Sequence, residues 1–128
     1  MIYTRKQITN CALMVKGSHE DRLNLLGTQK CKDIVSFMDE YKACTTVDEK
    51  QELFSRIYQY CLENEPYVAI GLLVMFTLVQ YFFTLSEVPQ FEQYLLKYTP
   101  FVKINPPIDI DLLSDQEYIN SLPETYDL

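Results

Sequence analysis

The chain has 128 residues, the length of one ordinary domain, and 48% of them are hydrophobic, so it can bury a core of its own. It carries 18 acidic and 11 basic residues, and the resulting net charge of −7 argues against a nucleic-acid binder, because such proteins use Lys and Arg to neutralise phosphates. With three Gly and one His, phosphate-cradling loops and most histidine-based catalytic or zinc sites are excluded.

The first third of the chain predicts three helices. Thr4 and Gln7 have the spacing of a capping box, and the helix that they open should end at Gly17, where glycine is free to adopt a positive φ. A second, short helix is expected from Ser18 to Gly27, and a third should begin directly after it. The apolar residues that recur at helical spacing are Ile8, Cys11, Ala12, Val15, Leu23, Leu26, Cys31, Ile34, Val35, Met38 and Tyr41.

A fourth helix is expected to follow the capping-box pair Thr46 and Glu49. Leu53, Phe54, Ile57, Tyr58 and Cys61 form its apolar face. On its polar face, Glu52 and Arg56 are four residues apart in the favourable order for an ion pair within the helix.

The segment 67–85 contains no charged residue and is long enough to span a bilayer, which takes about 17–25 apolar residues. However, Thr77, Gln80 and Thr84 add polar groups to its second half, and both flanks are acidic, so no cationic loop would set an orientation. A helix that is apolar all round is also the natural centre of a bundle. We therefore expect a buried central helix, with a membrane span as the alternative.

The last part of the chain predicts a helix after Pro89 and an extended connection over residues 101–111. A short helix should then open with a capping box at Ser114 and Glu117 and end before Pro123. The predicted fold is all-α, a compact bundle of about six or seven helices around the central helix 67–85. It forms a single domain over residues 1–128, with an extended acidic C-terminal segment at 104–128. If strands occur, we expect them at 11–15 or 108–112.

The four cysteines, Cys11, Cys31, Cys44 and Cys61, have none of the close spacings of a zinc or redox motif. The apolar run near the N-terminus is too short for a signal-peptide core of about 7–15 residues. We therefore expect free thiols in a reducing cytoplasm, while two disulfides remain an arithmetical alternative.

The residues that usually carry chemistry do not combine into a catalytic pattern. His19 is followed by Glu20 and Asp21, but consecutive side chains at a helix start point in different directions and cannot converge on one ion. No nucleophile elbow, zinc-protease motif or nucleotide-binding glycine motif is present. We expect no catalytic, cofactor or metal site, and hence no enzyme and no small-molecule substrate.

Charge is distributed unevenly along the sequence: +4 over residues 1–32, −5 over 33–66, balanced over 67–103, and −6 over 104–128, which has no cation at all. The acidic residues of this last segment alternate with aliphatic and aromatic ones, a combination that can dock on a basic surface. The predicted partner-binding residues are Asp109, Asp111, Asp115, Glu117, Tyr118, Glu124, Tyr126 and Asp127, with Asp48, Glu49 and Glu52 as a possible extension.

Two functional hypotheses follow from these observations. The first is a non-enzymatic acidic protein that neutralises a basic protein partner, most concretely a cytoplasmic immunity or antitoxin protein that blocks a nuclease toxin, with no direct contact to nucleic acid or membrane. The second is a helical groove-binding adaptor, because an apolar helix wrapped by amphipathic ones resembles the architecture of Bcl-2-like regulators. The chain has no Trp and therefore lacks the Asn-Trp-Gly-Arg signature of that family.

Overall fold

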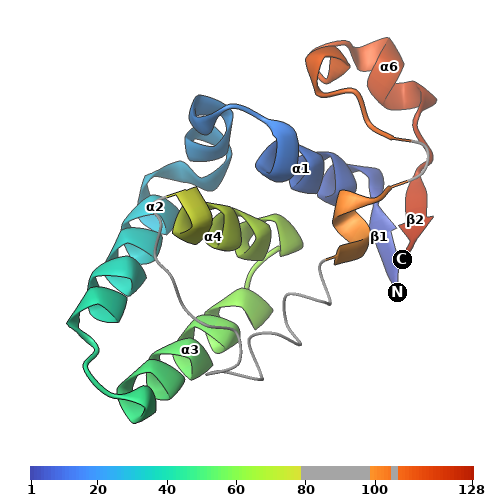
Figure 1. Cartoon of the computed structure of the whole chain (residues 1–128). Coiled ribbons are helices and arrows are strands. Elements are labelled where there is room, and N and C mark those ends of the chain that lie inside the picture. Colours follow the sequence, from blue (N-terminus) through green and yellow to red (C-terminus); the bar gives the residue numbers. More distant parts are fainter. Residues whose placement is uncertain (79–98, 105–106) are drawn as a thin grey trace.

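The computed structural model describes residues 1–78, 99–104 and 107–128, and within these ranges the chain is mostly helical with one two-stranded sheet (Figure 1). The elements are β1 (Ile2–Thr4), α1 (Arg5–Lys16), α2 (His19–Ala43), α3 (Val47–Leu62), α4 (Pro66–Leu78), the 3₁₀ turns η2 (Thr99–Val102) and η3 (Ile110–Leu112), α6 (Gln116–Ser121) and β2 (Thr125–Asp127). The prediction of a mainly helical protein is confirmed. The second part of the predicted central helix and the helix predicted after Pro89 lie outside the described residues.

Helix α4 is the apolar helix against which α1, α2 and α3 pack. Val68, Ala69, Ile70 and Leu72 of α4 are buried among the core residues of the other three helices. At Gly71 the fit to α1 is close, because an added Cβ would lie only 3.1 Å from the Met14 Sδ atom. The described part of the uncharged segment therefore occupies the core position that its composition predicts.

Helix α1 begins as predicted, with a complete capping box. The Gln7 amide donates to Thr4 Oγ1 at 3.2 Å, and the Gln7 Oε1 atom accepts from the Thr4 amide at 2.9 Å. The expectation of a positive φ at Gly17 is wrong, because its φ is −72°. Glycine is required there for space, since a Cβ would overlap the Leu13 carbonyl oxygen.

Helix α2 contains the break that Gly27 predicts. The element begins with a second capping box, between Ser18 and Asp21, and ends at Ala43. In between, Gly27 has φ 81° and ψ 167°, a backbone conformation that is nearly exclusive to glycine. The prediction of two helices that meet at Gly27 is therefore confirmed, and α2 consists of these two helices joined at a kink.

Helix α3 begins at the predicted position, where Thr46 Oγ1 accepts from the Glu49 amide at 3.2 Å. The predicted ion pair within this helix is replaced by one between helices. The Arg56 guanidinium donates to both carboxylate oxygens of Glu40 on α2, at 3.3 and 2.8 Å. This pairing raises the pKa of Arg56, and it links α3 to α2, which sequence spacing within one helix does not reveal.

The C-terminal segment differs from the prediction at two points. The predicted extended connection 101–111 contains the second half of η2 at its start and the first two residues of η3 at its end. The N-cap of α6 is Asp115 and not Ser114, because the Asp115 Oδ1 atom accepts from the Glu117 amide at 2.9 Å. The Asp115 carboxylate takes the capping role predicted for Ser114, and the helix therefore begins one residue later than predicted.

Strands were expected, if anywhere, at 11–15 or 108–112, but 11–15 belongs to α1 and 108–112 contains η3. Instead, β1 and β2 pair in antiparallel fashion at the two chain ends, with Tyr3 opposite Tyr126. Each strand has only three residues, too few for an alternating pattern to be recognised in the sequence. Figure 1 shows the N- and C-termini side by side at this sheet.

Within residues 1–78, 99–104 and 107–128, none of the helices combines the length and the apolar character needed to cross a bilayer.

The kink provides the first testable prediction. Gly27→Ala should lower the free energy of unfolding by about 1–3 kcal/mol, because alanine is strained at this φ and ψ. No atom lies within 4 Å of the added Cβ, so the loss would arise from the backbone alone. Urea denaturation measures it, with the exposed Asn24→Ala on the same helix as the control. Equal stability of the two variants would contradict the strained backbone at Gly27.

Candidate functional site

Four of the predicted partner-binding carboxylates lie together in one exposed stretch of the C-terminal segment. Asp109, Asp111, Asp115 and Glu117 are all exposed, and we call them the acidic surface. Two of them are also fixed by local bonds: Asp109 Oδ1 accepts from the Asp111 amide at 3.1 Å, and Asp115 caps α6. These carboxylates therefore have defined positions while remaining open to solvent.

The two predicted tyrosines support this segment from within. The Tyr118 hydroxyl accepts a hydrogen bond from the Asp109 amide at 2.6 Å, which closes the loop that bears the acidic surface. Tyr126 is only 6% exposed and its hydroxyl has no hydrogen-bond partner among the described residues. Burial raises the pKa of Tyr126. Its ring belongs to the core and is not presented to a partner.

The apolar residues that alternate with the acids also point mainly inward. Ile108 and Leu122 are buried, at 5% and 7% exposure, and Ile110 and Leu113 pack partly against the core. Leu112 is the exception, with 43% of its surface exposed. The alternating pattern thus anchors the segment to the protein and leaves Leu112 beside the carboxylates.

The remaining two predicted carboxylates, Glu124 and Asp127, lie beside the cationic N-terminus. Asp127 Oδ1 is 3.3 Å from the Met1 amino group, and Glu124 lines a small hollow of about 390 Å³ together with Arg5 and Lys6. The Arg5 guanidinium donates to the Pro123 carbonyl oxygen at 3.4 Å. The positive start of the chain therefore offsets the acidic charge at this end of the segment.

The possible extension of the acidic face to α3 is not supported by the arrangement of the helices. Asp48, Glu49 and Glu52 lie in the first turns of α3, and Figure 1 shows this end of α3 at the opposite side of the molecule from α6. The two acidic groups are therefore separate surfaces.

Within the described ranges, no three His, Cys, Asp or Glu side chains are grouped so that they could hold a metal ion. All four cysteines are free. Burial raises the pKa of the Cys11 thiol to about 12, with a smaller contribution from the nearby Glu65 carboxylate, so this thiol is protonated at neutral pH.

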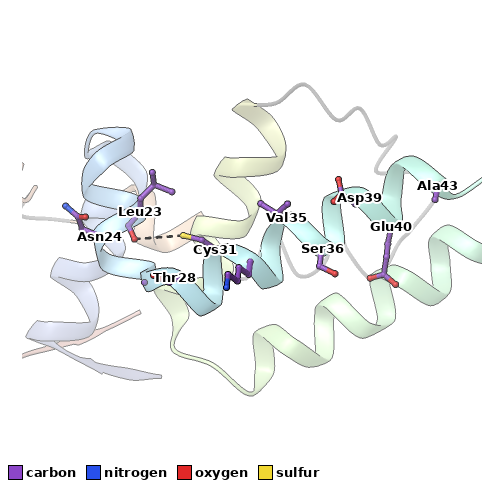
Figure 2. A pocket seen from close by; sticks show the side chains of 11 residues that line it. Leu23, Asn24, Thr28, Cys31, Val35, Ser36, Asp39, Glu40 and Ala43 are labelled. Carbon is purple, nitrogen blue, oxygen red and sulfur yellow. Dashed lines mark hydrogen bonds between the residues drawn. The ribbon is translucent and has the colours of Figure 1, made fainter.

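A second surface feature, which the sequence analysis did not identify, is a hollow of about 920 Å³ along α2 (Figure 2). Its described lining comes from α2 alone, on both sides of the kink. Leu23 and Val35 are exposed there, at 36% and 51%, and the Cys31 thiol points toward the Leu23 carbonyl oxygen at 4.0 Å. The prediction that Leu23 and Val35 belong to the apolar stripes of their helices is therefore wrong, because in a sequence an apolar residue on an outer face is hard to distinguish from a core residue.

No known protein family, no curated protein and no solved structure matches this chain.

The two tyrosines provide a matched pair of substitutions. Tyr118→Phe should lower the free energy of unfolding by about 0.5–1.5 kcal/mol, because the Asp109 amide loses its acceptor. Tyr126→Phe should leave stability unchanged or raise it by up to about 1 kcal/mol, because it removes a buried hydroxyl that makes no bond. Thermal and urea unfolding measure both changes. The interpretation fails if Tyr126→Phe is the more destabilising of the two.

Proposed function

We propose that this protein is a non-enzymatic, acidic protein-binding domain whose acidic surface docks on a basic surface of another protein. In its most concrete form it is a cytoplasmic immunity or antitoxin protein that occludes the cleft of a nuclease toxin. Such a cleft is cationic because it holds phosphates, and a partner that supplies carboxylates can occupy it without any chemistry of its own.

The observation that carries this proposal is the set of four exposed carboxylates between Asp109 and Glu117, in a segment that contains no cation. Local caps hold the carboxylates of Asp109 and Asp115 in position before any partner arrives, and the Tyr118 hydrogen bond holds the backbone of the loop that bears all four. Charges that are already ordered lose little conformational freedom on binding, so more of their attraction to a basic surface contributes to affinity.

The same surface has little apolar area, since Leu112 is its exposed aliphatic residue and its neighbours point inward. Association would therefore depend on long-range attraction more than on hydrophobic burial. Charge at the rim of an interface mainly accelerates association and is screened by salt. The binding should accordingly be fast at low ionic strength and weaken as salt is added.

The alternative of a groove-binding adaptor has less support. The hollow along α2 is the feature that would serve such an adaptor, and the large aliphatic residues exposed in its described lining are only Leu23 and Val35.

The test compares two doubly substituted proteins as bait in native lysate. Asp111→Asn with Glu117→Gln removes two charges from the acidic surface and leaves the capping residues Asp109 and Asp115 intact. Asp48→Asn with Glu52→Gln removes the same charge from α3 at the far side of the molecule and is the control. All baits carry the same tag, and bound proteins are identified by mass spectrometry at low and high salt.

We expect the wild type and the α3 control to retain one basic protein at low salt, and high salt or the Asp111/Glu117 variant to release it. With the purified partner, association of that variant should be slower by about tenfold at low salt. If both double variants bind the partner equally fast, the acidic surface is not the docking site and the proposal is wrong.

A further inference from the structure

The second half of α2 carries a complete exposed stripe on the side opposite its core residues. Thr28, Lys32, Val35, Ser36, Asp39 and Ala43 are all exposed, and we call them the α2 outer face. Apart from the adjacent pair Val35 and Ser36, they recur every three or four residues, so they lie along one side of the helix. Ile34, Met38 and Tyr41 form the buried side. The hollow shown in Figure 2 runs along the outer face.

At the centre of this stripe lies an aliphatic side chain, Val35, with 51% of its surface in solvent. Ser36 beside it is small, as are Thr28 and Ala43 at the two ends of the stripe. Small residues let a second helix approach to the usual 8–10 Å between axes and cover the valine. Among the described residues, the face therefore has the shape of a surface on which another helix can pack.

The charges of the face are arranged so that it is complementary to itself. Lys32 and Asp39 are seven residues apart, about 10 Å along the helix, and the midpoint between them falls between Val35 and Ser36. A two-fold axis through that midpoint would set a second α2 antiparallel to the first. Each Lys32 would then face Asp39 of the partner subunit, on both sides of the axis.

Both charges are available for such a pairing. In the described ranges, the side chains of Lys32 and Asp39 make no hydrogen bond or ion pair with another residue. Glu40, which follows Asp39, is held by Arg56 and is not required. Since copies of a protein with net charge −7 repel each other, contact is easiest through a face whose own charges balance.

We propose that the α2 outer face is a homodimer interface, in which two α2 helices pack antiparallel with Val35 at the two-fold axis and two Lys32–Asp39 ion pairs across it. One helix pair buries less than the roughly 1,600 Å² of a standard interface, so the dimer should dissociate in about the micromolar range. This surface is separate from the acidic surface, and the proposal stands independently of the function proposed above.

The test is sedimentation equilibrium of the purified chain and its variants over a range of concentrations under reducing conditions. Wild type should show a reversible monomer–dimer equilibrium. Val35→Glu should abolish the dimer, because it buries two like charges at the axis. Since Val35 is exposed in the monomer, circular dichroism should report an unchanged fold. Ser55→Glu, at an exposed position on α3, adds the same charge elsewhere and is the control.

A charge exchange distinguishes the proposed geometry from other dimers. Lys32→Glu and Asp39→Lys should each weaken dimerisation at least tenfold, because each places like charges opposite one another twice. The double variant Lys32→Glu/Asp39→Lys restores opposite charges and should return the dissociation constant to within about threefold of the wild type.

Three results would overturn the proposal. The first is a wild type that stays monomeric at all concentrations. If the wild type then captures a different protein and Val35→Glu abolishes that capture, the face binds that protein and not a second copy. The second is a dimer that Val35→Glu leaves intact. The third is a double variant whose loss of dimerisation free energy equals the sum of the losses in the two single variants. This result would exclude the antiparallel pairing.

Discussion

The structure depends above all on the burial of α4 against α1. A helix that is apolar on all sides cannot remain in water, so the amphipathic helices must cover it, and α1 makes the most extensive contact. The absence of a side chain at Gly71 brings α4 close to Met14, which is fully buried between the two helices. A hydrogen bond from the Gln7 side chain to Glu65, at 3.2 Å, joins the start of α1 to the residue before α4. Because α1 is fixed in this way, its N-terminal end forms a well-positioned edge to which the C-terminal segment can attach.

The C-terminal segment is attached to that edge, and its charged residues owe their positions to this attachment. Strand β2 pairs with β1, which leads directly into α1, and the Arg5 amide donates to the Glu124 carbonyl oxygen at 2.9 Å. Tyr3 in turn packs edge-on against Phe101, with the ring centroids 4.8 Å apart. Most apolar residues of the segment are buried by this anchoring, whereas its carboxylates remain exposed together with Leu112. A single requirement, that the segment be held to α1, thus explains both the buried Tyr126 and the exposed acids.

What the sequence could predict is what depends on residues a few positions apart. The capping box of Thr4 and Gln7, the break at Gly27 and most of the inward stripe of α3 are such features, because short-range sterics and helical periodicity determine them. The exception in the stripe is Tyr58, which was predicted on the buried face and is 37% exposed. Arg56 paired with Glu40 rather than with Glu52 because packing of α3 on α2 offers a partner that spacing within one helix cannot reveal. The sheet and the burial of Tyr126 depend on contacts between opposite ends of the chain. The acids of the C-terminal segment were therefore recognisable from composition, whereas the inward direction of their apolar neighbours was not.

The two surfaces differ in what they can recognise, and the fold keeps them apart. The acidic surface is single-signed and almost without apolar area, which suits a basic partner met through long-range attraction. The α2 outer face is balanced in charge and has an aliphatic centre, which suits a short-range contact with a matching copy. Figure 1 shows α6 and the second half of α2 at different ends of the molecule, so occupation of one surface leaves the other open. Pairing through α2 would therefore give a dimer with two acidic surfaces, and a partner with two basic sites would be bound more tightly than either surface alone allows.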